Sequence, residues 1–131
     1  MDGGVSDKKQ IGLTNSGDGA LAKLSELELF ATPMDAYRFA IAYAIAAELP
    51  LSSAPDGGYN TKYNASGGVD FDGSIRDILL ELRIGDSNRP YATAERLAEI
   101  GLRDLSQRVT AHESLDEILR STVGLAHRDA E

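Results

Sequence analysis

Residues 70–74 read Asp-Phe-Asp-Gly-Ser and carry oxygen-bearing side chains at every second position. With Glu81, these oxygens match positions one, three, five and twelve of a calcium-binding loop. The sixth position of such a loop needs glycine for a sharp turn, and here it is Ile75. We therefore expect Asp70 or Asp72 to cap a helix. The prediction is that the segment holds no metal.

Histidines and glycine-rich motifs could also carry chemistry. The only histidines are His112 and His127, and neither has a second histidine at metal-ligand spacing. The sequence has no G-x-S-x-G elbow, no phosphate loop and no G-x-G-x-x-G opening a helix. We therefore expect no catalytic residues, no cofactor and no enzymatic activity, although scattered carboxylates could still converge in a pocket.

Three arginines, Arg89, Arg96 and Arg103, recur every seven residues and predict one stripe along a helix. Such a stripe could contact phosphate or an acidic protein. Glu99 lies between two of them at helical neighbour spacing, which favours a solvated face that neutralises itself. Together with Tyr59 and Tyr63, these arginines are the candidate partner contacts.

The elements that must position these residues are mostly helices. Residues 10–14 alternate as a short strand does, and residues 50–69 form a long loop rich in Gly and Pro in which Tyr59, Thr61 and Tyr63 could form a hairpin strand. Apolar residues at helical spacing predict helices over 19–29, 34–47, 72–84 and 90–105, and a last one opening at the capping-box pair Thr110 and Glu113.

The helix over 34–47 has the clearest start, because Thr32 can cap it and Pro33 suits its first position. Its only charged residues are Asp35 and Arg38, so apolar side chains surround it. A helix of this kind is either the central helix of its domain or is shared with a second copy. The candidate oligomer interface is Tyr37, Phe39, Ile41, Tyr43 and Ile45.

Length and composition describe a small acidic protein. The 131 residues suit a single domain over 1–131, with residues 1–9 and 125–131 expected to be flexible. Thirteen basic and 21 acidic residues give a net charge of -8, which disfavours DNA as a partner. Without cysteine, without an apolar leader and with no apolar run longer than nine residues, the chain is expected to be cytoplasmic and free of membrane contact.

The order of strand, helix, turn and helix over residues 10–48 resembles the ribbon–helix–helix family of DNA-binding proteins. The resemblance rests on Ile11 and Leu13 in the strand, on Thr32-Pro33 opening the second helix, and on three leucines of the first helix, Leu21, Leu24 and Leu27. It implies strands that pair across a dimer and enter the major groove. The DNA contacts would then be Lys8, Lys9, Gln10 and Thr14.

Together these patterns predict a mainly α fold with four to five helices around a central apolar helix, and a short N-terminal strand. The expected function is that of a non-catalytic accessory protein, a homodimer or larger homo-oligomer that acts through contacts with a protein partner. The alternative is a DNA-binding protein of the ribbon–helix–helix type.

Overall fold

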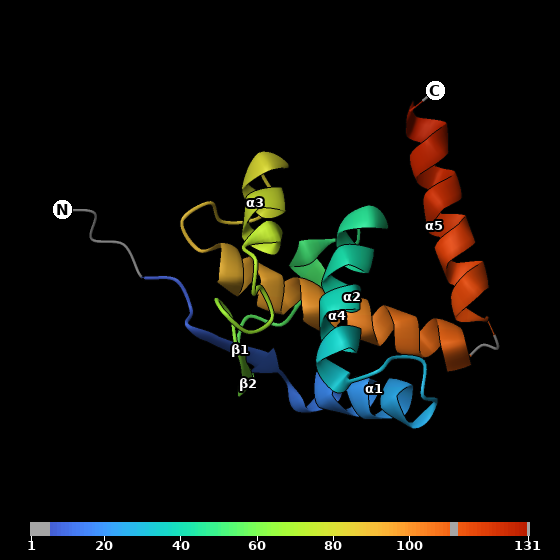
Figure 1. Cartoon of the computed structure of the whole chain (residues 1–131), viewed down its shortest axis with the longest axis horizontal. Helices are drawn as coiled ribbons and strands as arrows, with labels where there is room; N and C mark the ends of the chain where they lie inside the picture. Colours follow the sequence, from blue (N-terminus) through green and yellow to red (C-terminus); the bar gives the residue numbers. More distant parts are fainter. Residues whose placement is uncertain (1–5, 111–112, 131) are drawn as a thin grey trace.

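The structure, a computed structural model, describes residues 6–110 and 113–130, with side chains described as far as Thr122. Its longest helix, α4 (Pro90–Thr110), crosses the middle of the molecule and contacts α1, α2, α3, β1 and a short 3-10 turn, Leu51–Ser53 (Figure 1). One face of α4 is apolar and buried because Leu97, Leu102 and Leu105 recur at helical spacing.

Two further helices cover α4. Helix α1 (Asn15–Glu26) and helix α2 (Pro33–Ala46) both pack on it, and α2 stands across it in Figure 1. The Thr32 hydroxyl accepts a hydrogen bond from the Asp35 N–H at 3.1 Å, so the predicted cap of α2 is confirmed. Helix α1 begins earlier than predicted, because Thr14, rather than a residue of the following turn, accepts from its first turn.

The remaining helices extend from α4 on the same side as α2 (Figure 1). Helix α3 (Ser74–Glu81) is shorter than predicted. As expected, Asp70 caps it, since its carboxylate accepts from the N–H groups of Ile75 and Arg76 at 2.9 and 3.1 Å. Helix α5 (Leu115–Ala130) projects from the far end of α4 and begins after the predicted position, with Ser114 as its cap.

The two strands lie far apart in the sequence and form one antiparallel sheet. Strand β1 (Gln10–Leu13) pairs with β2 (Asn60–Asn64), which lies inside the segment predicted to be a loop. The expected strand around Tyr63 is therefore present, but its partner is the N-terminal strand rather than a neighbouring segment. A bulge shifts the register between Ile11 and Gly12.

The predicted mainly helical fold with a short N-terminal strand is confirmed, but its central helix is α4 and not α2. Helix α2 is buried along one side, whereas Ala42 and Ala46 are exposed and Phe39 and Ile45 are half-buried. Because an alanine side chain exposes little apolar surface, a helix with apolar residues on every side need not be buried on every side.

Close packing of α2 against α4 depends on a glycine. A Cβ atom on Gly101 would lie 2.3 Å from the carbonyl oxygen of Ala40. A larger residue at this position would therefore push the two helices apart.

Candidate functional site

Two buried glutamates of α4, which we call the carboxylate pair, bind the N-terminal strand. Glu95 and Glu99 lie one turn apart and are 3% and 0% exposed. Glu95 Oε2 accepts from the Gly12 N–H at 2.9 Å, and the two oxygens of Glu99 accept from the Thr14 N–H and hydroxyl at 3.0 and 2.6 Å. Strand β1 and the residue that follows it, Thr14, are therefore held to α4 by hydrogen bonds that these carboxylates accept.

Two cations balance the charge of the carboxylate pair. Lys8 forms an ion pair with Glu95, and Arg103 Nε lies 2.7 Å from Glu99 Oε2, although this N–H is not aligned for a hydrogen bond. Each buried carboxylate thus has both a cationic neighbour and backbone or hydroxyl donors. Buried charges are tolerated when they are satisfied in this way.

The burial of Glu99 corrects the prediction of a solvated face, whereas the predicted neutralisation by an arginine at helical spacing is confirmed by the ion pair with Arg103. A close approach makes this burial possible, because a Cβ atom on Gly17 would lie 2.1 Å from Glu99 Oε1. The sequence interpretation also overlooked Glu95. Its position was a usable signal, since Glu95 lies four residues after Tyr91 and three before Ala98, within the apolar stripe of α4.

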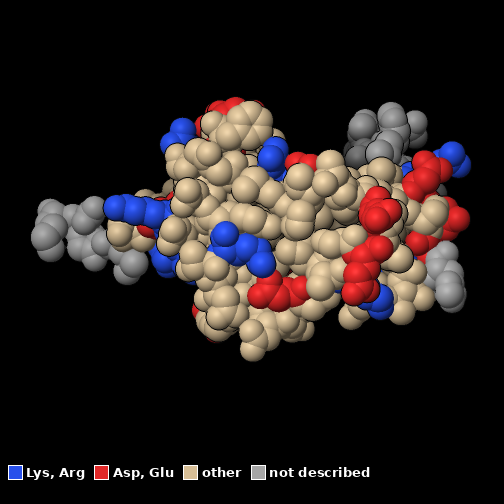
Figure 2. Space-filling model, turned by 60° about the horizontal axis from the view of Figure 1, so that its bottom comes forward, with Lys and Arg blue, Asp and Glu red and all other residues tan. Residues whose placement is uncertain are grey.

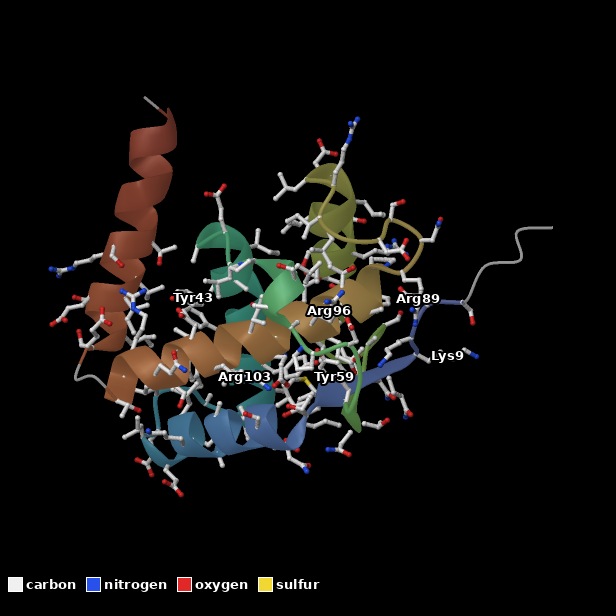
Figure 3. All side chains as sticks on the ribbon, turned by 180° about the vertical axis from the view of Figure 1, so that it is seen from behind. Lys9, Tyr43, Tyr59, Arg89, Arg96 and Arg103 are labelled. Carbon is white, nitrogen blue, oxygen red and sulfur yellow. The ribbon has the colours of Figure 1, made fainter. Side chains whose placement is uncertain are left out.

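Beside the carboxylate pair is a cavity of about 330 Å³, which we call the arginine pocket. It lies between the start of α4 and the loop before β2, on the face seen in Figure 3. Three cationic side chains line it, together with an aromatic ring and three acidic side chains: Lys8, Arg89 and Arg96; Tyr59; and Asp56, Asp86 and Glu95.

Tyr59 forms one wall of the arginine pocket. Lys8 Nζ lies 5.4 Å from the centre of its ring, and its hydroxyl donates to the Pro55 carbonyl at 2.8 Å. Burial, followed by the negative charges of Glu99 and Glu95, raises the pKa of Tyr59 to about 12. The side chain is therefore a neutral phenol at physiological pH.

The arginines of the pocket retain unused donors. Arg96 Nη2 donates to the carbonyl oxygens of Leu51 and Ala54 at 3.3 and 3.4 Å and lies 3.6 Å from the fully exposed carboxylate of Asp56. The Nε–H groups of Arg89 and Arg96 are buried and have no acceptor among the residues that the structure describes. Arg89 also forms no ion pair with any of the described residues.

The predicted partner contacts separate into two groups. Arg89, Arg96 and Tyr59 all line the arginine pocket, and Figure 3 labels the three. Arg103 lies further along α4, on the carboxylate pair. Tyr63 packs edge-on against Tyr37, with 5.2 Å between ring centres, and does not line the pocket.

Most of the residues predicted for an oligomer interface belong to the core of this chain. Tyr37, Ile41 and Tyr43 are at most 4% exposed, so they cannot contact a second copy directly. The Tyr37 hydroxyl donates to the Gly12 carbonyl at 2.9 Å, and burial raises the pKa of Tyr37. Of the five, only Phe39 and Ile45 are partly exposed.

The predicted DNA contacts occupy different environments. Lys9 and Gln10 are exposed, whereas Lys8 is ion-paired and Thr14 is a buried helix cap. Strand β1 has β2 along one edge and side chains of α4 and α2 along the other. Within the described residues, no edge of β1 is left for a strand from a second copy.

Figure 2 shows the face that includes α1, where acidic side chains are most numerous toward the right-hand end and basic side chains are scattered, some beside acidic ones. This face therefore has no continuous basic surface. Groups of three or more potential metal ligands do not occur in the described part of the chain; His112 and the side chain of His127 fall outside it.

A comparison of this chain with protein-family models, curated proteins and solved structures finds no match. Among the described residues, no helix has the length and apolar character that crossing a membrane requires. Any functional conclusion must therefore come from the site itself.

Proposed function

We propose that this protein is a non-catalytic, oligomeric accessory protein, and that it binds an acidic protein partner at the arginine pocket. The observation that carries the proposal is the pair of buried Nε–H donors of Arg89 and Arg96, which have no acceptor within the described chain. A partner that supplies carboxylate or phosphate oxygens would satisfy them.

The use of the acidic side chains supports a binding role over a catalytic one. Glu95 accepts from the backbone of β1, Glu99 from the backbone of Thr14, and Asp70 from the backbone at the start of α3. Asp7 likewise accepts from the N–H groups of Tyr91 and Ala92. General acid–base catalysis needs a carboxyl group free to exchange a proton with substrate, and these four have structural partners.

Exposed apolar side chains on and beside α3 support the oligomeric part of the proposal. Phe71 is 65% exposed, and Ile78, Leu80 and Leu82 are 41–56% exposed. Of these, Ile78 and Leu82 lie one helical turn apart on the same face, and neighbouring apolar side chains at a surface often mark contacts between proteins. Sedimentation of the purified chain is expected to give the mass of a dimer or larger assembly. A monomer that persists at high concentration would contradict this part.

Binding to short peptides tests the partner assignment. A glutamate-rich peptide is expected to bind, and an uncharged glutamine-rich peptide of equal length is not. Arg89→Gln should weaken binding of the glutamate-rich peptide by about tenfold, as expected for the loss of a charged hydrogen bond. The matched control is Arg120→Gln on α5, where Arg120 is exposed and paired with Asp116. Equal binding of both peptides, or equal loss in both variants, would refute the proposal.

A DNA-binding function remains the alternative. It is favoured by a larger cavity of about 750 Å³ beside the start of β1, which is lined in part by Lys8, Lys9 and Arg76. In this case a short duplex should bind at low salt, and Lys9→Ala should weaken binding and reduce its salt dependence. Absence of duplex binding at low salt would end this alternative.

A further inference from the structure

We infer that the arginine pocket is a specific site for a single oxyanion group, a carboxylate or a phosphate, held by Arg89 and Arg96. The inference deepens the proposed function, since it identifies the chemical group through which the partner would enter. It rests on the same pocket but is testable with small ions alone.

The guanidinium groups of Arg89 and Arg96 each keep a donor that no described residue satisfies. Both Nε–H groups are shielded from solvent without an acceptor among the described residues, although buried polar groups in folded proteins are nearly always hydrogen-bonded. Arg38 and Arg103 have an Nε–H group in the same state, but only Arg89 and Arg96 line this cavity, so an anion in the cavity would meet the guanidinium groups of these two. A guanidinium group presents its N–H donors in a plane that matches the two oxygens of a carboxylate or phosphate.

The acidic side chains of the pocket do not supply an acceptor for these donors. Both oxygens of Glu95 have partners, Gly12 N–H and Lys8. Asp86 accepts from the Asn88 N–H at 2.9 Å. Asp56 is fully exposed and lies 3.6 Å from Arg96, and ion pairs of this kind contribute little.

The volume of the arginine pocket limits the size of the group that it can hold. A cavity of about 330 Å³ lies at the lower end of the range for small-molecule sites. It suits one anionic head group with its nearest atoms rather than a whole nucleotide. Tyr59 and the Lys8 chain over its ring close one side, so an anion in the pocket would be partly withdrawn from water, where charged hydrogen bonds are stronger.

The test observes the arginine Nε–H resonances directly by nitrogen–proton NMR. Inorganic phosphate and acetate are titrated separately into the full chain, with sodium chloride holding the ionic strength constant. Saturable shifts are expected for Arg89 and Arg96, and not for Arg120, which is exposed on α5. A response to phosphate alone would identify a phosphate site, and a response to acetate as well would identify a general oxyanion site.

Two substitutions separate geometry from charge. Arg89→Gln should weaken oxyanion binding by about tenfold, and Arg89→Lys should restore only part of it because lysine lacks the planar fork. Arg89 makes no ion pair within the described residues, so both variants are expected to fold, which circular dichroism checks. Absence of saturable shifts, or equal shifts at Arg120, would overturn the inference.

The outcome is separable from that of the proposed function. Oxyanion binding without recognition of acidic peptides would leave the pocket assignment intact and remove the protein partner. Binding of the acidic peptide that leaves the Arg89 and Arg96 resonances unshifted would support a protein partner and overturn the assignment of the pocket. Duplex DNA that shifted these resonances while acidic peptides did not would overturn the assignment to a protein partner.

Discussion

Replacing Glu99 by glutamine tests whether the carboxylate pair stabilises the fold. The glutamine keeps the shape of the side chain but loses the charge and one acceptor oxygen. In the native chain, the carboxylate accepts twice from Thr14 and lies 2.7 Å from Arg103 Nε. The new amide NH₂ would face either the Thr14 hydroxyl, which already accepts from the Gly17 N–H, or the guanidinium of Arg103.

The size of the effect follows from these contacts. A hydrogen bond to a charged group contributes about 1.5–3 kcal/mol, and removal of one member of a buried ion pair costs about 3–5 kcal/mol. The Arg103 side chain is 34% exposed and can regain hydration, which lowers the second figure. We therefore expect Glu99→Gln to reduce the free energy of unfolding by about 2–4 kcal/mol, a large part of the ~5–15 kcal/mol typical of a domain.

Urea denaturation followed by circular dichroism measures this change. With a urea dependence of about 2 kcal/mol per M, the midpoint should fall by about 1–2 M at unchanged slope. The matched control is Glu81→Gln at the exposed end of α3, which should change stability by less than about 0.5 kcal/mol. If Glu99→Gln behaved like the control, the carboxylate pair would not stabilise the fold and the reasoning would fail.

Three further predictions concern packing, ionisation and capping. Gly101→Ala should destabilise the chain by about 1–3 kcal/mol, because the new Cβ atom would meet a carbonyl oxygen of α2. The control Gly19→Ala, where a Cβ atom would meet open space, should stabilise the chain by about 0.5–1 kcal/mol. Thermal unfolding distinguishes the two variants, and similar effects of both would contradict the close packing of α2 on α4. Phenolate absorbance should show Tyr59 and Tyr91 ionising near pH 12, since burial, with Asp70 contributing at Tyr91, raises each pKa. Because the folded state favours the neutral phenol, the stabilisation that these two tyrosines give is complete below about pH 10 and is lost between about pH 10 and 12. Ionisation of both tyrosines near pH 10 would contradict this prediction. Asp7→Asn should cost about 1 kcal/mol in urea unfolding by weakening the cap of α4, and no change would mean that this cap is dispensable.

The sequence was most informative where local chemistry determines structure. Thr32 and Pro33 marked the start of α2, and Asp70 was expected to cap a helix, because these signals act within a few residues of their partners. The meeting of Tyr59 with Arg89 and Arg96 was only partly predictable. Their residue types suggested binding, but the fold decides that they share a pocket.

The prediction failed where a contact joins distant parts of the chain. Residues 7–9 were expected to be loose, yet Asp7 caps α4, Lys8 pairs with Glu95 and the Lys9 carbonyl accepts from Ala65. Helix periodicity cannot show that an acid within an apolar stripe faces a backbone from the other end of the protein. For the same reason, the choice of α2 as the central helix relied on composition, whereas burial depends on what packs beside each face.

The attachment of β1 to α4 has a consequence for biosynthesis. Thr14 and Glu99 are separated by 85 positions, so at a rate of about 5–20 residues per second the strand emerges roughly 4–17 s before its carboxylate partner. During that interval the strand exposes unpaired N–H and C=O groups, which can pair with other chains. A nascent chain stalled before residue 90 would carry both strands without the glutamates that lock them, and would therefore be prone to association on the ribosome.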